Sequence, residues 1–408
     1  MDYRPCTPVR HDGPISHSVY PNIYFTPGRY SPRPTQPQLP TPSHMITPGP
    51  MAPFFRHNRL PKAKDITSVN EEQVAPIGNP KSAYTQEFVR RFKEWHTGKG
   101  VLSSPEGREN VLTLEITMPH FLDFKKALDI DNDEKFPRYS YDASSSLLTI
   151  QCTPSPIHEQ IVSTVSEGFT LARRSLPTSL RRMIHIVGNQ QFTDFQGAYD
   201  GSEKAPDTAV KVTDATGAVE VKFVLEVGLA ETYAMLVRDA KMWIEGREAA
   251  SIVMIVKMEE TPVYKCPTRN LSEDEFSELG FPPRTEIDVK NFTLGGPYGP
   301  AFYKGLRWVG GVTGFMEIWK RDPVTRLATR TSSDRINLLN MANTTYTHFW
   351  LHDFVDISPD NDHHIPIDWG DYISNLGLYI KELAADRCRR TLRGREGRET
   401  MLDDDYEP

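Results

Sequence analysis

The chain has 408 residues, of which 10% are aromatic, and a formal net charge of −7 at pH 7. This length supplies one large or two ordinary domains with a real core, and the net acidity excludes a protein that coats nucleic acid by overall charge alone. The four cysteines lie far apart and match no zinc spacing, and no window approaches the roughly 18 apolar residues of a membrane helix. We therefore expect reduced thiols and an intracellular protein, in the nucleus or cytoplasm, that does not span a membrane.

Residues 1–80 form a proline-rich tail. They hold 16 of the 33 prolines, many in Thr-Pro or Ser-Pro steps, and show almost no hydrophobic periodicity. Such a composition buries too little apolar surface to offset the entropy of ordering, so we expect a disordered segment with polyproline character. We also expect this tail to recruit protein partners.

Residues 81–154 predict an extension of helices and strands. Phe88, Phe92 and Trp95 recur at helical spacing, while later runs alternate in the manner of strands. The expected elements are a helix over Ser82–His96, a strand over Val111–Thr117, a short helix over His120–Leu128 and a strand over Ser146–Cys152.

Residues 155–260 predict the core of the fold. Ser155 and Pro156 are typical of a helix start, and apolar residues follow at every fourth position from Ile157. The elements expected next are three strands, a helix and a strand, over Arg182–Val187, Pro206–Val212, Val221–Val227, Leu229–Glu245 and Ser251–Met258. This order predicts an α/β (α+β) fold with a mixed central sheet buried on both faces, and the last strand should be central because it has no polar face.

The remaining chain predicts an insertion and the completion of the domain. Residues 261–305 are rich in proline and glycine and should form a loop-rich insertion. Over 306–395 we expect an edge strand at Gly314–Lys320 and a closing helix at Asp368–Leu392, followed by an acidic tail at 396–408.

Two charged runs in this part have open interpretations. The six arginines between Arg387 and Arg398 suit contacts with nucleic-acid phosphates, a nuclear-import signal, or simply a solvated helix end. The stretch His352–Asp368 gathers three histidines and five aspartates, which suits either a metal site or a solvated acidic loop.

Two acids stand at strand ends within the core. Asp207 follows Pro206 at the head of one expected strand, and Glu226 lies near the end of the next. If these strands pair, both carboxylates reach one edge of the sheet, where a hard cation such as Mg²⁺ takes oxygen ligands and activates a water. The alternative is a turn residue and a solvated strand end, but an ionised Glu226 in an apolar strand is costly without a partner.

This arrangement resembles the PD-(D/E)XK nuclease superfamily, which has the restriction-endonuclease-like fold. The resemblance covers about Ser155–Met258 and is carried by the Pro206-Asp207 pair, Glu226 in LEVG, the helix with Asp239 and Trp243, and the strand SIVMIVKM. It implies metal-dependent hydrolysis of phosphodiester bonds in nucleic acid. Asp207 and Glu226 would bind Mg²⁺, and Glu159 would assist.

The chain departs from the superfamily at its lysine. That residue belongs two positions after the acid, where this sequence has Gly228. Lys241 on the following helix is the candidate replacement, although such domains often place the basic residue four positions before Trp243, where this chain has Asp239. Two functions stay open: a metal-dependent nuclease acting through Asp207, Glu226 and Lys241, or a catalytically inactive nuclease-fold interaction module that binds partners through its proline-rich tail.

Overall fold

The computed structural model describes residues 83–96, 111–130, 137–151, 154–331, 335–339 and 349–404. The proline-rich tail expected over 1–80 lies outside these residues. The described part is of mixed α/β class, with seven α-helices and three sheets. No helix within it is long and apolar enough to cross a membrane.

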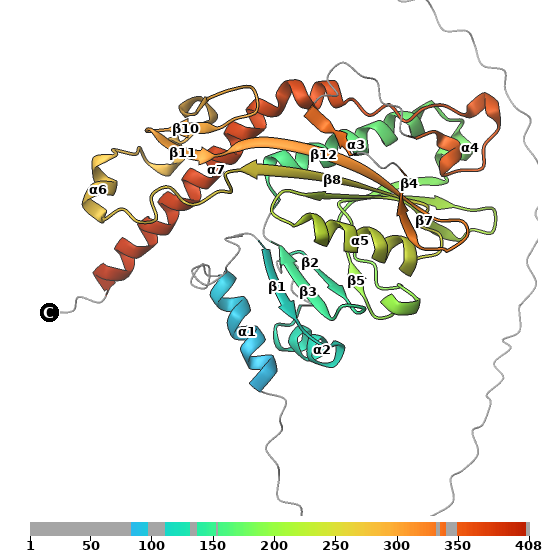
Figure 1. The fold of residues 1–408 in the computed structure, drawn as a ribbon, viewed down its shortest axis with the longest axis horizontal. Helices are drawn as coiled ribbons and strands as arrows, with labels where there is room; N and C mark the ends of the chain where they lie inside the picture. The colour runs from blue at the N-terminus through green and yellow to red at the C-terminus, as the bar shows by residue number, and fades with distance from the viewer. Residues whose placement is uncertain are drawn as a thin grey trace, which may run out of the picture. The chain divides into compact units, whose positions relative to one another are not determined.

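A mixed central sheet forms the middle of the fold (Figure 1). Its strands are β4 (Ile184–Val187), β6 (Thr208–Thr213), β7 (Val219–Gly228), β8 (Ile252–Thr261), β12 (Gly311–Arg321), β13 (Ala328–Arg330) and β14 (Ile336–Asn337). They follow the order β13-β12-β8-β7-β6-β4, and β14 pairs with β12. Strands β7 and β8 run parallel, and the other neighbours run antiparallel.

Helices cover both faces of this sheet. Helices α3 (Pro156–Ser175) and α7 (Trp369–Asp404) pack on one face, and α5 (Tyr233–Gly246) packs on the other (Figure 1). The expected order of helix, three strands, helix and strand is present as α3, β4, β6, β7, α5 and β8, with the short α4 (Thr178–Arg181) after α3. The central place of β8 is confirmed, because it lies between β7 and β12.

Local signals explain where the core helices begin. The Ser155 hydroxyl accepts a hydrogen bond from the His158 backbone N–H at 3.2 Å, which satisfies one of the free donors at the start of α3. The Thr232 hydroxyl does the same for Met235 at the start of α5, at 3.1 Å. Both caps fix the first turn of a helix beside the end of the sheet that carries Asp207 and Glu226.

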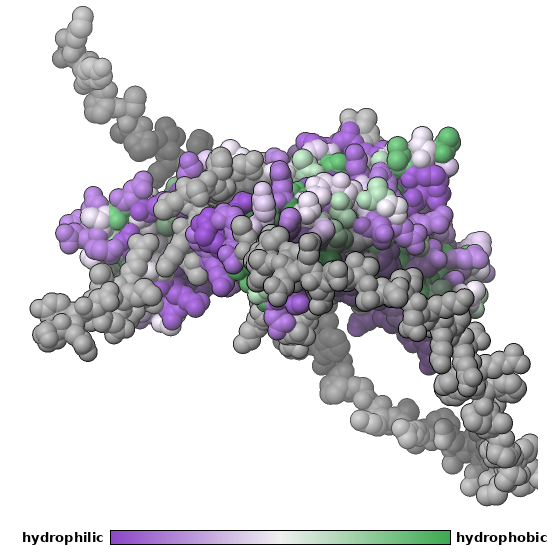
Figure 2. All heavy atoms as spheres, turned by 90° about the horizontal axis from the view of Figure 1, so that it is seen from below, coloured by the Kyte–Doolittle hydropathy of each residue, from purple (hydrophilic) through white to green (hydrophobic). Residues whose placement is uncertain are grey.

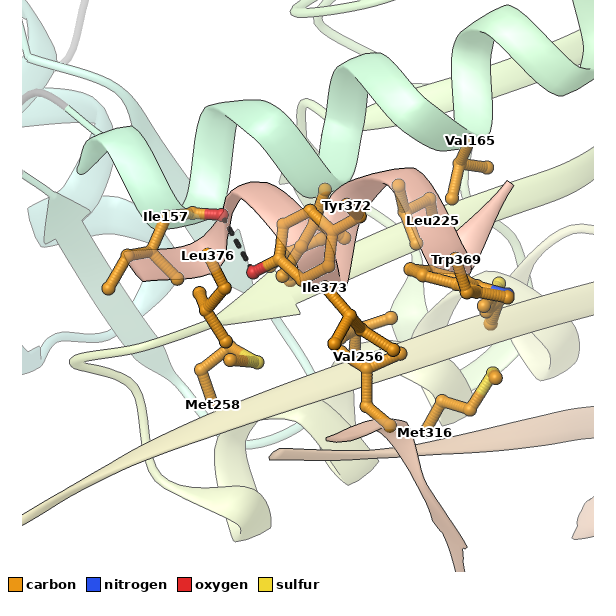
Figure 3. Packing of buried hydrophobic residues seen from close by; sticks show 14 of the residues in the cluster. Ile157, Val165, Leu225, Val256, Met258, Met316, Trp369, Tyr372, Ile373 and Leu376 are labelled. Carbon is orange, nitrogen blue, oxygen red and sulfur yellow. Dashed lines mark hydrogen bonds between the residues drawn. The ribbon is translucent and has the colours of Figure 1, made fainter. Parts of the chain in front are cut away.

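The main hydrophobic core lies between the sheet and the pair α3 and α7. Figure 3 shows Tyr372 and Leu376 of α7 between Ile157 of α3 and the strand residues Val256 and Met258. The Tyr372 hydroxyl donates to the Ile157 carbonyl at 3.5 Å. These side chains are almost completely buried, so α7 and α3 together cover this face of the sheet.

The part of the chain expected to be a loop-rich insertion contains regular elements. They are α6 (Glu273–Glu278), the 3₁₀ turns Arg284–Glu286 and Val289–Asn291, β9 (Thr293–Leu294) and β10 (Ala301–Tyr303). Strands β9 and β10 form a three-stranded sheet with β11 (Leu306–Val309). The expected edge strand at Gly314–Lys320 is part of β12, which is not an edge because β13 and β14 pair along its outer side.

A smaller sheet has a core of its own. It follows the order β1-β3-β2-β5, with β1 (Val111–Glu115), β2 (Tyr139–Asp142), β3 (Leu147–Gln151) and β5 (Glu203–Lys204). Helices α1 (Ala83–His96) and α2 (Met118–Ala127) pack with it around buried aromatic residues, including Phe121 and Tyr141, whose rings stack at 4.1 Å. Strand β5 comes from the loop between β4 and β6, so it ties this sheet to the central one.

The C-terminal arginines hold α7 in place. Arg387 forms a two-pronged ion pair with Glu260 of β8, at 2.8 Å for each bond, and lies 4.0 Å over the Tyr264 ring. Arg395 pairs with Glu273 of α6 at 2.7 Å. These contacts favour a structural role for this part of the arginine run over one in binding phosphates.

The Arg387–Glu260 pair gives a test of how α7 is fastened. Arg387→Ala should lower the free energy of unfolding by about 3 kcal/mol, because it leaves the buried Glu260 carboxylate without its cation. Arg390→Ala, at an exposed position of the same helix, should change it by less than about 0.5 kcal/mol. Urea unfolding measures both, and equal effects would contradict the role given to Arg387.

Candidate functional site

Asp207 is fixed beside Glu226 by the backbone of β7. The Asp207 N–H donates to the Leu225 carbonyl at 3.2 Å, and the Val227 N–H donates to Asp207 Oδ2 at 2.6 Å. Asp207 is therefore bonded to the residues on both sides of Glu226. The two acids lie at the same end of the neighbouring strands β6 and β7, and both are buried.

Two cations neutralise Asp207. His158 Nε2 lies 3.1 Å from Asp207 Oδ1, and Arg138 donates to the same oxygen and to the Ala205 carbonyl. Burial by itself raises the pKa of the Asp207 carboxyl, but Arg138 and His158 outweigh it and hold that pKa well below its usual range. Burial by itself lowers the pKa of His158, and the charge of Asp207 outweighs it and raises the pKa to about 10.

Glu226 has a different set of partners. Trp243 of α5 donates its indole N–H to Glu226 Oε1 at 2.6 Å, and Lys204 Nζ lies 3.4 Å from Oε2. Lys204 also donates to Asp239 of α5 at 3.0 Å. Burial raises the pKa of Glu226, and although Lys204 opposes this, the negative charges of Asp207 and Asp239 add to it.

A fourth acid completes the cluster. Glu231, between β7 and α5, accepts a hydrogen bond from the Gln151 side chain at the end of β3. Burial raises the pKa of Glu231, and the charge of Asp239 adds to this effect. We call the seven ionisable residues Arg138, His158, Lys204, Asp207, Glu226, Glu231 and Asp239 the charge cluster.

The lysine of this cluster is Lys204, which is not among the residues predicted from the sequence. The feature that could have indicated it is its position three residues before Asp207, in the run Lys-Ala-Pro-Asp. At Gly228, where the resemblance places a lysine, a Cβ would lie 2.8 Å from Cδ1 of the fully buried Leu236, so a side chain there would force Leu236 to shift. Helix α5 thus lies close against β7 at Gly228.

The other predicted residues lie outside or at the rim of the cluster. Lys241 is on the exposed side of α5. Glu159 is largely exposed, with Oε1 3.6 Å from His158 Nδ1. In the His352–Asp368 stretch, His352 pairs with Asp362 at 2.6 Å while His363 contacts Ser175 of α3. Among the residues that the structure describes, no group of three or more His, Cys, Asp or Glu is arranged to hold a metal ion.

The chemistry of Asp207 and Glu226 suits Mg²⁺, but their surroundings do not. Carboxylate oxygens are the ligands this ion prefers. Here Arg138 and His158 occupy Asp207 Oδ1, the Val227 N–H occupies Oδ2, Trp243 occupies Glu226 Oε1 and Lys204 approaches Oε2. The acids as arranged do not fit a metal, because three of the four oxygens accept hydrogen bonds from the protein and an ammonium group lies against the fourth.

Glu317, a buried acid elsewhere in the fold, is also neutralised by cationic side chains, although its surroundings do not resemble an active site. Glu317 of β12 is fully buried and pairs with Arg330 at 2.8 Å and Arg335 at 3.1 Å. It also accepts hydrogen bonds from the Tyr233 hydroxyl and the Trp319 indole. Neutralised buried carboxylates are thus a repeated structural feature of this protein.

Comparisons of the chain with protein-family models, with curated proteins and with solved structures found no match. Function is therefore inferred from the geometry of the charge cluster and from the resemblance noted in the sequence. The cluster consists of largely buried ionisable side chains at the junction of the two sheets and α5. It can fasten these elements together through paired charges.

Substitutions of Lys204 and Lys241 test which of the two lysines belongs to the charge cluster. Lys204→Met should cost about 3–5 kcal/mol of stability, because it leaves Glu226 and Asp239 buried without their cation. Lys241→Met should change the stability by less than about 0.5 kcal/mol, since its side chain is exposed. Denaturant unfolding of the two variants compares them directly, and a larger loss for Lys241→Met would contradict this assignment.

His158 makes stability depend on pH. Because its pKa rises from 6.5 to about 10 on folding, the stabilisation it provides is complete below pH 6.5 and is lost as the pH rises toward 10. The raised pKa of Glu226 acts in the same direction. We expect the melting temperature to fall across this range, and the fall to be smaller in His158→Asn. The exposed His96 supplies the control, and an unchanged pH profile in His158→Asn would refute this account.

Proposed function

We propose that this chain contains a nuclease-like domain of the PD-(D/E)XK type that does not catalyse and that serves as an interaction module. The observation that carries the proposal is that protein groups already engage the carboxylates of Asp207 and Glu226: three of the four oxygens accept hydrogen bonds, and Lys204 Nζ lies 3.4 Å from the fourth. In such a domain the acids of the former active site form buried ion pairs that hold neighbouring elements of the fold together.

The arrangement of the core supports nuclease-like ancestry. Asp207 stands at the start of β6 and Glu226 on the neighbouring β7, which leads through α5 into the parallel β8. The superfamily often has a basic residue at the helix position that Asp239 occupies here. Lys204 places its ammonium group between Asp239 and Glu226, so the positive charge is kept while its source has moved.

The burial of the centre supports loss of catalysis. A hydrolase needs its substrate and a water within reach of the reacting groups. Asp207 and Glu226 are only 5% and 2% exposed, and their oxygens are engaged. Acids that are buried and paired in this way make the fold more rigid, and they are out of reach of a substrate.

The surface and the tail suggest how partners bind. On the face drawn in Figure 2, the coloured residues are mostly hydrophilic and the hydrophobic ones occur in small groups. The coloured residues of this face therefore form no broad apolar patch. The proline-rich segment of residues 1–80 is the part of the chain whose composition suits recognition by a protein partner.

One observation favours hydrolysis of nucleic acid as a second candidate. The superfamily's chemistry combines two acids with a lysine, and Lys204 Nζ lies 3.4 Å from Glu226 Oε2. In that case Asp207 and Glu226 would exchange their present partners for Mg²⁺, and Lys204 would take the place of the superfamily's lysine. Lys241 would have no part in the reaction.

A cleavage assay separates the two candidates. We expect the full-length protein with Mg²⁺ or Mn²⁺ to leave plasmid DNA and RNA oligonucleotides intact, and its melting temperature to be unchanged by either ion. Cleavage that is lost in Asp207→Asn but kept in Asp200→Asn, a change at an exposed acid, would instead establish the nuclease. Asparagine is used because it keeps the shape of the side chain.

A further inference from the structure

Four arginines meet at one corner of the fold, where α4 leads into β4 (Figure 1). Arg173 and Arg174 lie in the last turn of α3, while Arg181 ends α4 and Arg182 follows it. The Arg173 Nε–H donates to the Arg181 carbonyl at 3.0 Å, so the two arginine pairs lie side by side. Arg174 and Arg182 are exposed, and the other two are half-buried. We call these four residues the arginine corner.

The arginine corner has no acid to neutralise it among the residues that the structure describes. None of its four side chains forms an ion pair there, whereas Arg330 and Arg387 each pair with a buried glutamate. Asp214 stands just after β6, but its Oδ1 accepts the N–H groups of Thr216 and Ala218 in its own turn. In a chain with a formal net charge of −7, this corner is a local excess of positive charge.

The strand that follows the corner, β4, is an edge of the central sheet. Its described neighbour is β6 alone. The Thr213 N–H donates to the Met183 carbonyl at 2.8 Å, and backbone groups alternate in direction along an antiparallel strand. Those of His185 therefore face β6, and those of Ile184 and Ile186 face away. Within the described part of the chain, Ile184 and Ile186 have no backbone partner on that outer side, so the edge is open to an added strand.

The charge of the corner selects what can occupy this edge. If a second copy of the chain paired through its own β4, two arginine corners would lie within about 13 Å of each other, the length of a four-residue strand. Their like charges would oppose this pairing. An extended segment that carries acidic residues has the opposite charge, and arginine binds a carboxylate through two parallel hydrogen bonds.

We propose that the arginine corner and the outer edge of β4 together form a docking site for an extended acidic peptide segment of a partner protein. The segment adds a strand beside β4 and places its carboxylates on Arg174 and Arg182. Main-chain hydrogen bonds and ion pairs thus act on the same segment.

This docking site is separate from the charge cluster. Arg173 follows His158 by 15 positions on α3, which is about 22 Å along the helix axis. No residue of the charge cluster takes part. The docking site therefore goes beyond the proposed function and does not depend on nuclease-like ancestry.

Three fluorescent octapeptides test the site by fluorescence anisotropy with the full-length protein. The first alternates Glu and Val, which gives an acidic segment with high strand propensity. The second alternates Glu and Pro, which keeps the charge but cannot form a ladder of hydrogen bonds. The third alternates Lys and Val. We expect the Glu-Val peptide to bind, and the other two to bind at least about tenfold more weakly.

Paired substitutions separate the corner from the net charge of the protein. Arg174→Gln with Arg182→Gln should weaken binding of the Glu-Val peptide about tenfold, because two ion pairs are lost. Arg390→Gln with Arg393→Gln removes the same charge from exposed positions of α7 and should change binding by less than about twofold.

Amide hydrogen exchange, followed by nuclear magnetic resonance, tests the backbone contact without any substitution. Addition of the Glu-Val peptide to the wild type should slow exchange at Ile184 and Ile186, because their N–H groups become hydrogen-bonded.

Several results would overturn the docking site. They are a Glu-Val peptide that does not bind the wild type, equal binding of the Glu-Pro or Lys-Val peptide, full binding by the Arg174→Gln and Arg182→Gln double variant, and unchanged exchange at Ile184 and Ile186. A single-stranded DNA oligonucleotide of equal charge that binds more tightly than the Glu-Val peptide, and that also needs Arg174 and Arg182, would assign the corner to nucleic acid instead.

Discussion

The need to keep a buried carboxylate ionised governs this structure. Asp207 sits in the interior, where a lone charge would be very costly. Its partners come from three separate elements: Arg138 before β2, His158 in the first turn of α3 and the Val227 N–H at the end of β7. One side chain therefore joins the smaller sheet, the first core helix and the central sheet, and misplacement of any of them would leave a charge unpaired.

The parts of the fold with strong local patterns could be predicted from the sequence. The cap at Ser155, the apolar residue at every fourth position of α3 and the apolar run of β8 are all local signals, and the structure has these elements. The strands that flank β12 could not be predicted, because β13 and β14 have only three and two residues and show no periodicity. The pairing of β5 with β2 depends on contacts between residues about sixty positions apart.

The same division applies to the charge cluster. Asp207 and Glu226 were recognisable because a Pro-Asp step and a lone acid in an apolar strand are local features. Arg138 has no such mark and reaches Asp207 only through the tertiary fold. Lys241 was a poor candidate on helical phase alone: it lies two residues after Asp239, which is about 200° around α5, so it faces away from the side on which Asp239 and Trp243 are buried.

The fastening of α7 has a consequence for synthesis of the protein. The α3 side of the central sheet is covered by Tyr372 and Leu376, and Arg387 pairs with Glu260, which precedes it by 127 positions. A ribosome makes the whole central sheet before it makes this helix. Until α7 emerges, only α3 covers this side of the sheet, so the apolar side chains that α7 buries stay exposed, a state in which aggregation competes with folding.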